Sequence, residues 1–298
     1  MSRIPVFYVP AMVGHPAGSY SPSAGKPAEV VADWLADSRI APHIEIIAFE
    51  PVSRAMFGAA HDPRYVDNVL ELRAMNGFSE VSESVALSLP YTSGSMLAAA
   101  LHVLDEPRRT QALRLACSPT SGFHHANHDH GHGFCTFNGL MVAAIELKRR
   151  DLVDRVLILD CDQHYGDGTQ DIIEHLGLGF ITHVTHATHA GRAFGCYRNK
   201  AQLTEFITEW LPQFAGPRSI VLYQAGADCH VADPLGGFLT TEEMRQRDAL
   251  VFTLARRHRV PLVWNLAGGY QRDANGTIAP VLRLHRNTVI EAIASLAG

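Results

Sequence analysis

Three carboxylates and an imidazole follow directly on an apolar run in the segment VLILDCDQHYGDGTQ, residues 156–170. The acidic residues are Asp160, Asp162 and Asp167, and the imidazole belongs to His164. Carboxylates held this close repel one another, and each is costly to remove from water. We expect a bound cation here, because a positive charge offsets both costs.

The apolar run 156–160 predicts a buried strand. If the chain stays extended beyond it, Asp160, Asp162 and His164 point to the same side. Asp228 follows a second apolar run and completes a set of two carboxylates and one imidazole. Three protein ligands with a vacant position for water are typical of catalytic zinc, although oxygen-rich ligation also suits Fe²⁺ or Mn²⁺. The alternative interpretation is a polar turn without a metal.

Histidines are concentrated between residues 124 and 132, where five of the 17 in the chain occur. The adjacent pair His124 and His125 suits a general base and an electrostatic partner. Each of them would need a carboxylate to fix its tautomer and raise its basicity. Asp160 and Asp167 are available for that role.

Three further histidines, His128, His130 and His132, occupy alternate positions in the same stretch. This spacing admits a second metal site. We expect a solvated loop instead.

Short apolar runs rich in β-branched residues alternate with helix-like segments. Such alternation predicts a mostly parallel sheet between two helical layers, with ligands bound beyond the C-terminal strand ends. We see no linker and no repeat, so we expect a single α/β/α domain over residues 1–298. The expected strands are 6–9, 44–49, 113–118, 156–160, 180–186, 220–226 and 262–268. The expected helices are 27–37, 63–75, 93–104, 137–150, 201–213 and 241–258.

Composition excludes several classes of protein. The net charge is −5 and there is no basic stripe, so we expect no direct binding of nucleic acid. The five cysteines form no C-x-x-C pair, which is typical of a chain from a reducing cytoplasm. No apolar run reaches eighteen residues and no signal peptide is visible, so we expect a cytoplasmic protein without a membrane span. The sequence does not indicate an oligomeric state.

Four segments together resemble the zinc-dependent histone deacetylase family, including its bacterial deacetylase-like and acetylpolyamine amidohydrolase members. They are SGFHHANHDHGHGFCTFNGL (121–140), LDCDQHYGDGTQDI (159–172), YQAGADCHVADPLGGF (223–238) and LAGGY (266–270). The resemblance implies the arginase/deacetylase-like fold, in which about eight parallel strands lie between helices.

The resemblance also implies a role for each of the residues above. It implies one metal centre, whose three ligands are Asp162, His164 and Asp228. It implies two histidine–aspartate pairs, which are His124 with Asp160 and His125 with Asp167. Tyr270 is implied as the residue that polarises the substrate carbonyl.

Two further sites follow from the resemblance. Phe134 and Phe194 are implied as walls of the acyl tunnel. A structural potassium ion is implied, held by the backbone carbonyls of Asp160, Asp162, His164 and His186 and the hydroxyl of Thr185. The chain departs from the family pattern at Tyr165, where a second histidine is common, and at Ala267, where a glycine is common. Neither departure removes a catalytic group.

The expected function is therefore metal-dependent hydrolysis of an acylated primary amine by a metal-activated water. The substrate would be acyl-lysine in a protein or an acylated small amine such as a polyamine, and Zn²⁺ the expected metal. Two alternatives remain open, a binuclear manganese ureohydrolase on the same fold and a non-catalytic binder of acyl-lysine.

Overall fold

One parallel sheet forms the centre of the computed structural model, which describes residues 3–105, 114–186 and 195–297. The order of the strands is β2-β1-β3-β8-β7-β4-β5-β6, and every neighbouring pair is parallel. The strands are β1 (Ile4–Phe7), β2 (Ile44–Ile47), β3 (Leu115–Ser118), β4 (Arg155–Asp160), β5 (Ile181–His186), β6 (Gly195–Tyr197), β7 (Ser219–Gln224) and β8 (Leu262–Asn265).

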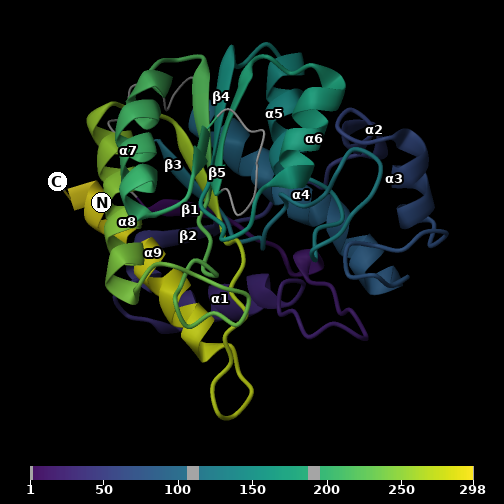
Figure 1. Ribbon diagram of the computed structural model, residues 1–298, viewed down its shortest axis with the longest axis horizontal. Helices are drawn as coiled ribbons and strands as arrows, with labels where there is room; N and C mark the ends of the chain where they lie inside the picture. Colours follow the sequence, from purple (N-terminus) through teal and green to yellow (C-terminus); the bar gives the residue numbers. More distant parts are fainter. Residues whose placement is uncertain (1–2, 106–113, 187–194, 298) are drawn as a thin grey trace.

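Helices cover both faces of this sheet (Figure 1). One layer contains α2 (Arg54–Phe57), α3 (Pro63–Leu70), α4 (Glu83–Leu104), α5 (Gly139–Arg149) and α6 (Asp167–Leu176). The other contains α1 (Lys26–Ala36), α7 (Lys200–Trp210), α8 (Thr241–Arg257) and α9 (Ala279–Ala297). The expected three-layer architecture, arginase/deacetylase-like in class, is confirmed.

Strand β4 shows why its sequence is continuously apolar. Val156 and Ile158 belong to the core beneath α4 and α5, whereas Leu157 and Leu159 belong to the core on the opposite face. All four side chains are buried. A strand with helices on both sides has no solvent-facing position, so it does not alternate between apolar and polar residues.

Several elements differ from the sequence-based prediction. Helix α4 begins at Glu83 rather than at residue 93, because the Ser82 hydroxyl caps it by accepting from the Val85 amide. The helix also runs through Pro90. The expected helix 63–75 ends at Leu70. Four of the helices and strands named above were not predicted, namely β6, α2, α6 and α9. The first residue of the expected strand 113–118 lies outside the described residues.

The central strands end level with one another. Asp160 of β4 pairs in register with Gln224 of β7, Gln224 with Asn265 of β8, and Asn265 with Ser118 of β3. The four loops that follow these strands therefore begin at one edge of the sheet.

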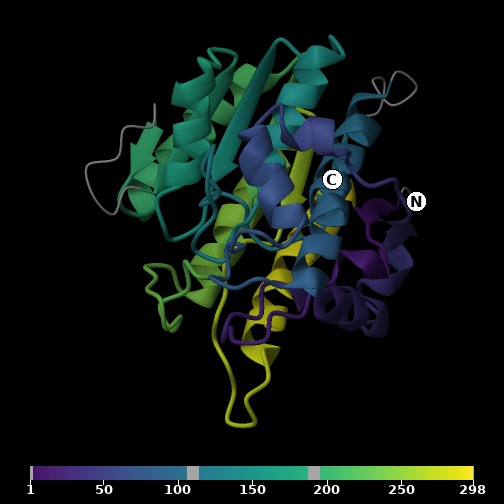
Figure 2. The ribbon, with the colours of Figure 1, turned by 90° about the vertical axis from the view of Figure 1, so that its right-hand side faces the viewer.

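In Figures 1 and 2, the yellow segment between β8 and α9 extends from the bottom of the molecule. None of the helices within the described residues is long and apolar enough to cross a membrane.

Candidate active site

Two carboxylates and an imidazole converge beyond the ends of β4 and β7. The Nδ1 atom of His164 lies 3.1 Å from Asp162 Oδ1 and 3.1 Å from Asp228 Oδ2. One ligand atom from each of the three residues falls within 4.8 Å of the others. Both carboxylates are buried, while the His164 side chain is 32% exposed. The three residues that the sequence analysis named as metal ligands are therefore brought together.

The electrostatics of this group require a positive charge. Burial, and then the charge of Asp162, raise the pKa of Asp228 to about 7. Hydrogen bonds to Asp162 and Asp228 raise the pKa of His164 to about 11, although burial opposes them. Protonated His164 supplies the positive charge between the carboxylates here. A cation bound by all three residues would supply more charge at the same place.

A buried arginine holds the two loops that carry the carboxylates. The Nη1 group of Arg247 donates to the carbonyl oxygen of Gly226, 2.9 Å away, and to that of Cys161, 3.3 Å away. Those carbonyls precede Asp228 and Asp162 in their loops. Arg247 is itself paired with Asp248, so the loop positions are fixed by a buried, charge-assisted contact. Sequence analysis did not identify Arg247, because nothing local distinguishes it from a surface arginine of α8.

Two histidine–aspartate pairs lie beside the three ligands. The Nδ1 atom of His124 is 2.7 Å from Asp160 Oδ2, and the Nδ1 atom of His125 is 2.5 Å from Asp167 Oδ1. Both pairs match those implied by the sequence. The first pair is buried, and the second is partly exposed, with 17% of the His125 side chain and 39% of the Asp167 side chain in contact with solvent.

The surroundings drive the pKa values of the two imidazoles apart. Burial alone would lower the pKa of His124, but the charges of Asp160 and Asp162 outweigh it and raise that pKa to about 9. Burial, and then the charge of His124, lower the pKa of His125. His124 therefore favours the charged form and His125 the neutral form.

Tyr270 is held at the end of the β8 loop by its backbone. Its amide donates to Asp233 Oδ2 at 2.8 Å. The preceding residues approach the metal-ligand loop closely, because Gly268 has a φ of +51° and a Cβ atom there would overlap the Asp228 carboxylate. Burial raises the pKa of the Tyr270 phenol well above its usual value, so the hydroxyl remains a hydrogen-bond donor at neutral pH.

A buried lysine also supports this turn. The Nζ atom of Lys26, the first residue of α1, donates to the carbonyl oxygen of Gly268. Burial lowers the pKa of Lys26 to about 8, opposed by the charges of Asp228 and Asp162. Lys26 has no exposed surface, and lysines are almost never fully buried unless they are paired. No local pattern marks Lys26, because Asp162, Asp228 and Gly268 are more than 130 residues away in the chain.

Aromatic rings surround the outer part of the site. The Phe134 ring lies 5.6 Å from that of Tyr270, 5.3 Å from that of Tyr20 and 5.8 Å from that of Phe78, measured between centroids. Phe134 lines the cavity of the site, and its role as a wall of an acyl tunnel stays a prediction. Tyr20 and Phe78 were not identified from the sequence. Phe194 lies outside the described residues.

A small cavity of about 10 Å³ lies between several of these groups. It is lined by Ser23, Ser121, Gly122, His124, His125, Gly133, Phe134, Cys135, Asp162, His164, Gly268 and Tyr270.

Two of the carbonyl groups expected to bind potassium, those of Asp160 and Asp162, lie beside the Tyr197 hydroxyl. The Tyr197 hydroxyl lies 3.0 Å from the Asp160 carbonyl oxygen and 3.4 Å from that of Asp162. The Thr185 hydroxyl accepts from the Gly166 amide, 3.0 Å away. The potassium ion stays a prediction.

The three alternate histidines do not meet at one point. His128 stacks on His175, with ring centroids 3.9 Å apart, and His130 pairs with Asp129 on the surface. His132 instead contacts the site, because its Nε2 atom lies 2.8 Å from Asp167 Oδ2. The His132 side chain is nevertheless 44% exposed, so it combines contact with solvent and contact with the second carboxylate oxygen of Asp167.

Comparison with known proteins agrees with this geometry. The family model of the histone deacetylase domain matches residues 22–194 and 176–283. The chain therefore belongs to the histone deacetylase family of hydrolases. An uncharacterised protein of Picosynechococcus sp. is 27% identical over 252 residues, which are 78% of this chain and 81% of that protein. Histone deacetylase 2 of Arabidopsis thaliana is 27% identical over 173 residues, or 53% of this chain and 45% of that protein.

Two solved structures share the fold. The crystal structure of the HDA15 HD domain superimposes with a TM-score of 0.76 at 20% identity, covering 99% of this chain and 88% of that one. The acetylpolyamine aminohydrolase of Burkholderia pseudomallei superimposes with a TM-score of 0.73 at 19% identity, covering 97% of this chain and 98% of that one. The chain spans less than half the length of the Arabidopsis deacetylase it matches.

We predict that Zn²⁺ stabilises the metal-free protein through Asp228. At a free concentration one hundred times the dissociation constant, binding adds about 2.7 kcal/mol, which for a chain of this length raises Tm by about 4 °C. In Asp228→Asn the increase should be largely lost, because an amide replaces a buried carboxylate ligand. Thermal unfolding followed by circular dichroism measures both. Asp154→Asn, on a surface ion pair with Arg218, is the matched control and should keep the full increase. An equal increase in Asp228→Asn would show that the ligand is wrongly assigned.

Proposed function

We propose that this chain is a metal-dependent hydrolase that removes an acyl group from an acylated primary amine, with residues 1–298 as one catalytic domain. The observation that carries the proposal is that one cavity is lined by Asp162 and His164 of the metal group, by the histidine of each histidine–aspartate pair and by Tyr270. The fold supports this proposal, because four neighbouring strands end at the same level and their loops meet at one edge of the sheet.

The residues present are suited to a divalent metal. Asp162, His164 and Asp228 offer two oxygens and one nitrogen, a donor set that Zn²⁺ accepts and that Fe²⁺ or Mn²⁺ also tolerates. Without a cation, two of these groups are buried carboxylates in mutual repulsion. A metal bound there would polarise the substrate carbonyl and lower the pKa of water.

His125 is the proposed general base. Asp167 accepts the hydrogen bond from Nδ1, which leaves the lone pair on Nε2 free to accept a proton from the attacking water. The lowered pKa of His125 keeps the ring neutral before the reaction. After it has taken the proton, the same nitrogen can pass it to the departing amine.

His124 and Tyr270 are proposed to stabilise negative charge. Because Asp160 and Asp162 keep His124 protonated, it contributes a positive charge next to the reacting atoms without exchanging its proton. The Tyr270 hydroxyl would donate a hydrogen bond to the carbonyl oxygen as charge develops on it. Pairs of titratable groups with divergent pKa values are a feature of acid–base sites.

The aromatic rings support an acyl amine on a slender, uncharged stem. Phe134, Tyr20 and Phe78 offer apolar ring faces, which suit methylene groups rather than a charged chain. We propose acyl-lysine in a protein or an acylated small amine as the substrate. A structural potassium ion beside Asp160 is part of the same proposal.

The two alternatives have less support. A binuclear manganese ureohydrolase needs carboxylates shared by two ions, but within the described ranges the two groups able to hold a metal share no residue. A non-catalytic binder of acyl-lysine would not require the proton-accepting pair His125 and Asp167 or the tyrosine hydroxyl.

The test of the proposal is hydrolysis by the Zn²⁺-loaded protein of two substrate classes, fluorogenic acyl-lysine peptides and acetylated polyamines. We expect release of free acid and free amine from at least one of them, and no turnover without metal. Absence of turnover on both classes across several acyl lengths, with zinc content verified, would contradict the proposal. Release of urea from a guanidino substrate would support the ureohydrolase.

A more specific prediction concerns Tyr270→Phe. This change removes one hydroxyl and should retain the metal and the fold, while the rate constant of turnover falls on the order of a hundred- to a thousandfold, as for other preorganised donors. KM should change much less, because the ground-state carbonyl carries less charge. Steady-state kinetics and the zinc content of the purified variant measure this. Tyr91→Phe, on α4 and remote from the cavity, serves as control. A loss under about threefold would remove Tyr270 from the chemistry.

A further inference from the structure

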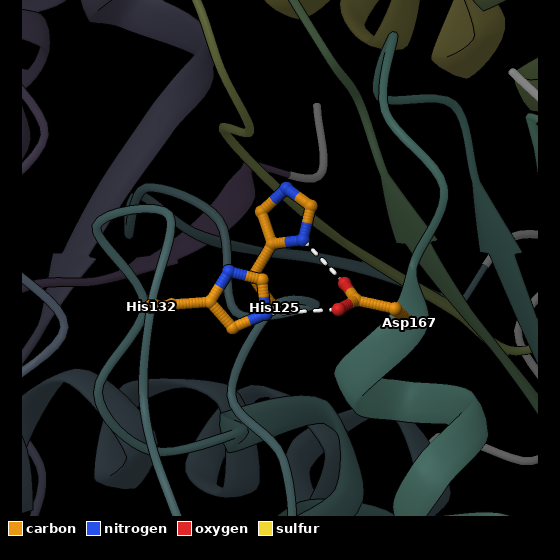
Figure 3. A group of neighbouring side chains, drawn as sticks. All are labelled: His125, His132 and Asp167. Atoms are coloured by element: carbon orange, nitrogen blue, oxygen red, sulfur yellow. Dashed lines mark hydrogen bonds and ion pairs between the residues drawn. The ribbon is translucent and has the colours of Figure 1, made fainter.

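Asp167 is shared by two imidazoles rather than one. His125 approaches one carboxylate oxygen through Nδ1 at 2.5 Å, and His132 approaches the other through Nε2 at 2.8 Å (Figure 3). The two rings lie 5.0 Å apart between centroids. One ligand atom from each of the three residues lies within 4.8 Å of the others, as in the group around His164.

The loop that carries His132 is held in place. The His132 carbonyl accepts from the Cys135 amide at 2.9 Å, and the Asn127 amide donates to the His130 carbonyl at 2.8 Å. Gly133 has a φ of +54°, and a Cβ atom there would touch the His125 ring. The close approach of His132 to His125 therefore depends on the backbone conformation of this loop. Backbone hydrogen bonds already fix that conformation, so a ligand would need to order the loop very little.

We propose that His125, His132 and Asp167 form a second Zn²⁺ site, weaker than the first, whose occupation switches off the general base of the proposed hydrolase. Two imidazole nitrogens and a carboxylate oxygen are ligands that Zn²⁺ prefers. The group is accessible to solvent, because 44% of the His132 side chain and 39% of the Asp167 side chain are exposed.

The inhibitory consequence follows from the chemistry of imidazole and rests on the proposed function. A neutral ring carries one proton and one lone pair. When Zn²⁺ takes the lone pair on Nδ1 of His125, the ring proton moves through solvent to Nε2. Nε2, the nitrogen proposed above to accept the proton, then donates a hydrogen bond and cannot accept a proton from water. The Asp167 carboxylate, which orients His125 in the metal-free form, becomes a ligand at the same time.

The site is tested by metal stoichiometry, which does not depend on turnover. The full-length, metal-free protein is titrated with Zn²⁺ alone, and bound metal is counted by plasma emission after gel filtration and by calorimetry. We expect two equivalents in the wild-type protein, one in His132→Ala, and two in His130→Ala. His130 is the matched control, because it lies in the same loop but pairs with Asp129. The remaining equivalent in His132→Ala reports that its fold is intact.

The variant Asp162→Asn separates the two proposals. It should lose the first equivalent and retain the second, which His132→Ala loses. Saturation of the wild-type protein at one equivalent, or retention of two by His132→Ala, would overturn the second site. In the activity assay, wild-type turnover should rise with the first equivalent and fall about a hundredfold or more with the second, as expected for loss of a general base. Two bound equivalents without that fall would overturn the inhibitory role and leave the hydrolase proposal untouched.

Discussion

The buried acidic group beyond β4 and β7 is the constraint on which the site depends. Asp160, Asp162 and Asp228 are all removed from water, and each must be compensated. Asp160 receives hydrogen bonds from His124, from the Gln224 side chain at 2.8 Å and from the Asp162 amide at 3.1 Å. Although burial alone would raise the pKa of Asp160, the charge of His124 outweighs it and lowers that pKa to about 2. Asp162 and Asp228 share the His164 imidazole, and each accepts one backbone amide, from His164 and from Gln163 respectively. Among the described residues, the one other side chain that forms an ion pair with either carboxylate is His124, whose Nε2 lies 3.5 Å from Asp162 Oδ1. This difference separates a carboxylate that orients a histidine from the two that are suited to a cation.

The remaining architecture places these groups and keeps them there. Parallel strands ending level bring four loops to one edge, and Arg247 ties two of those loops together from beneath. Lys26 and Asp233 hold the turn that carries Tyr270. Each of these contacts joins residues far apart in the chain, so the geometry exists only in the completed fold. Substitutions at Arg247 or Lys26 should therefore act on the site through the position of its loops.

Sequence reasoning succeeded where the signal was local. The apolar run before Asp160 predicted β4 because both faces of that strand are covered. The expected extended chain beyond it is wrong, because β4 ends at Asp160, and Asp162 and His164 meet in a bend, where the His164 amide donates to Asp162 Oδ1. The pairing of His125 with Asp167 came from resemblance, and it agrees with the geometry. Reasoning failed where the cause is tertiary. The expected helix 93–104 omitted the first ten residues of α4, Lys26 resembles any surface lysine, and His132 approaches Asp167 across 35 residues of sequence.

The central claim is that the three groups around His164 exist to hold a metal. Anomalous diffraction from a crystal of the Zn²⁺-loaded protein, recorded on both sides of the zinc absorption edge, tests it most directly. The account predicts a strong anomalous peak enclosed by the side chains of Asp162, His164 and Asp228. A zinc-loaded crystal with no peak there would contradict it, whatever else the protein binds.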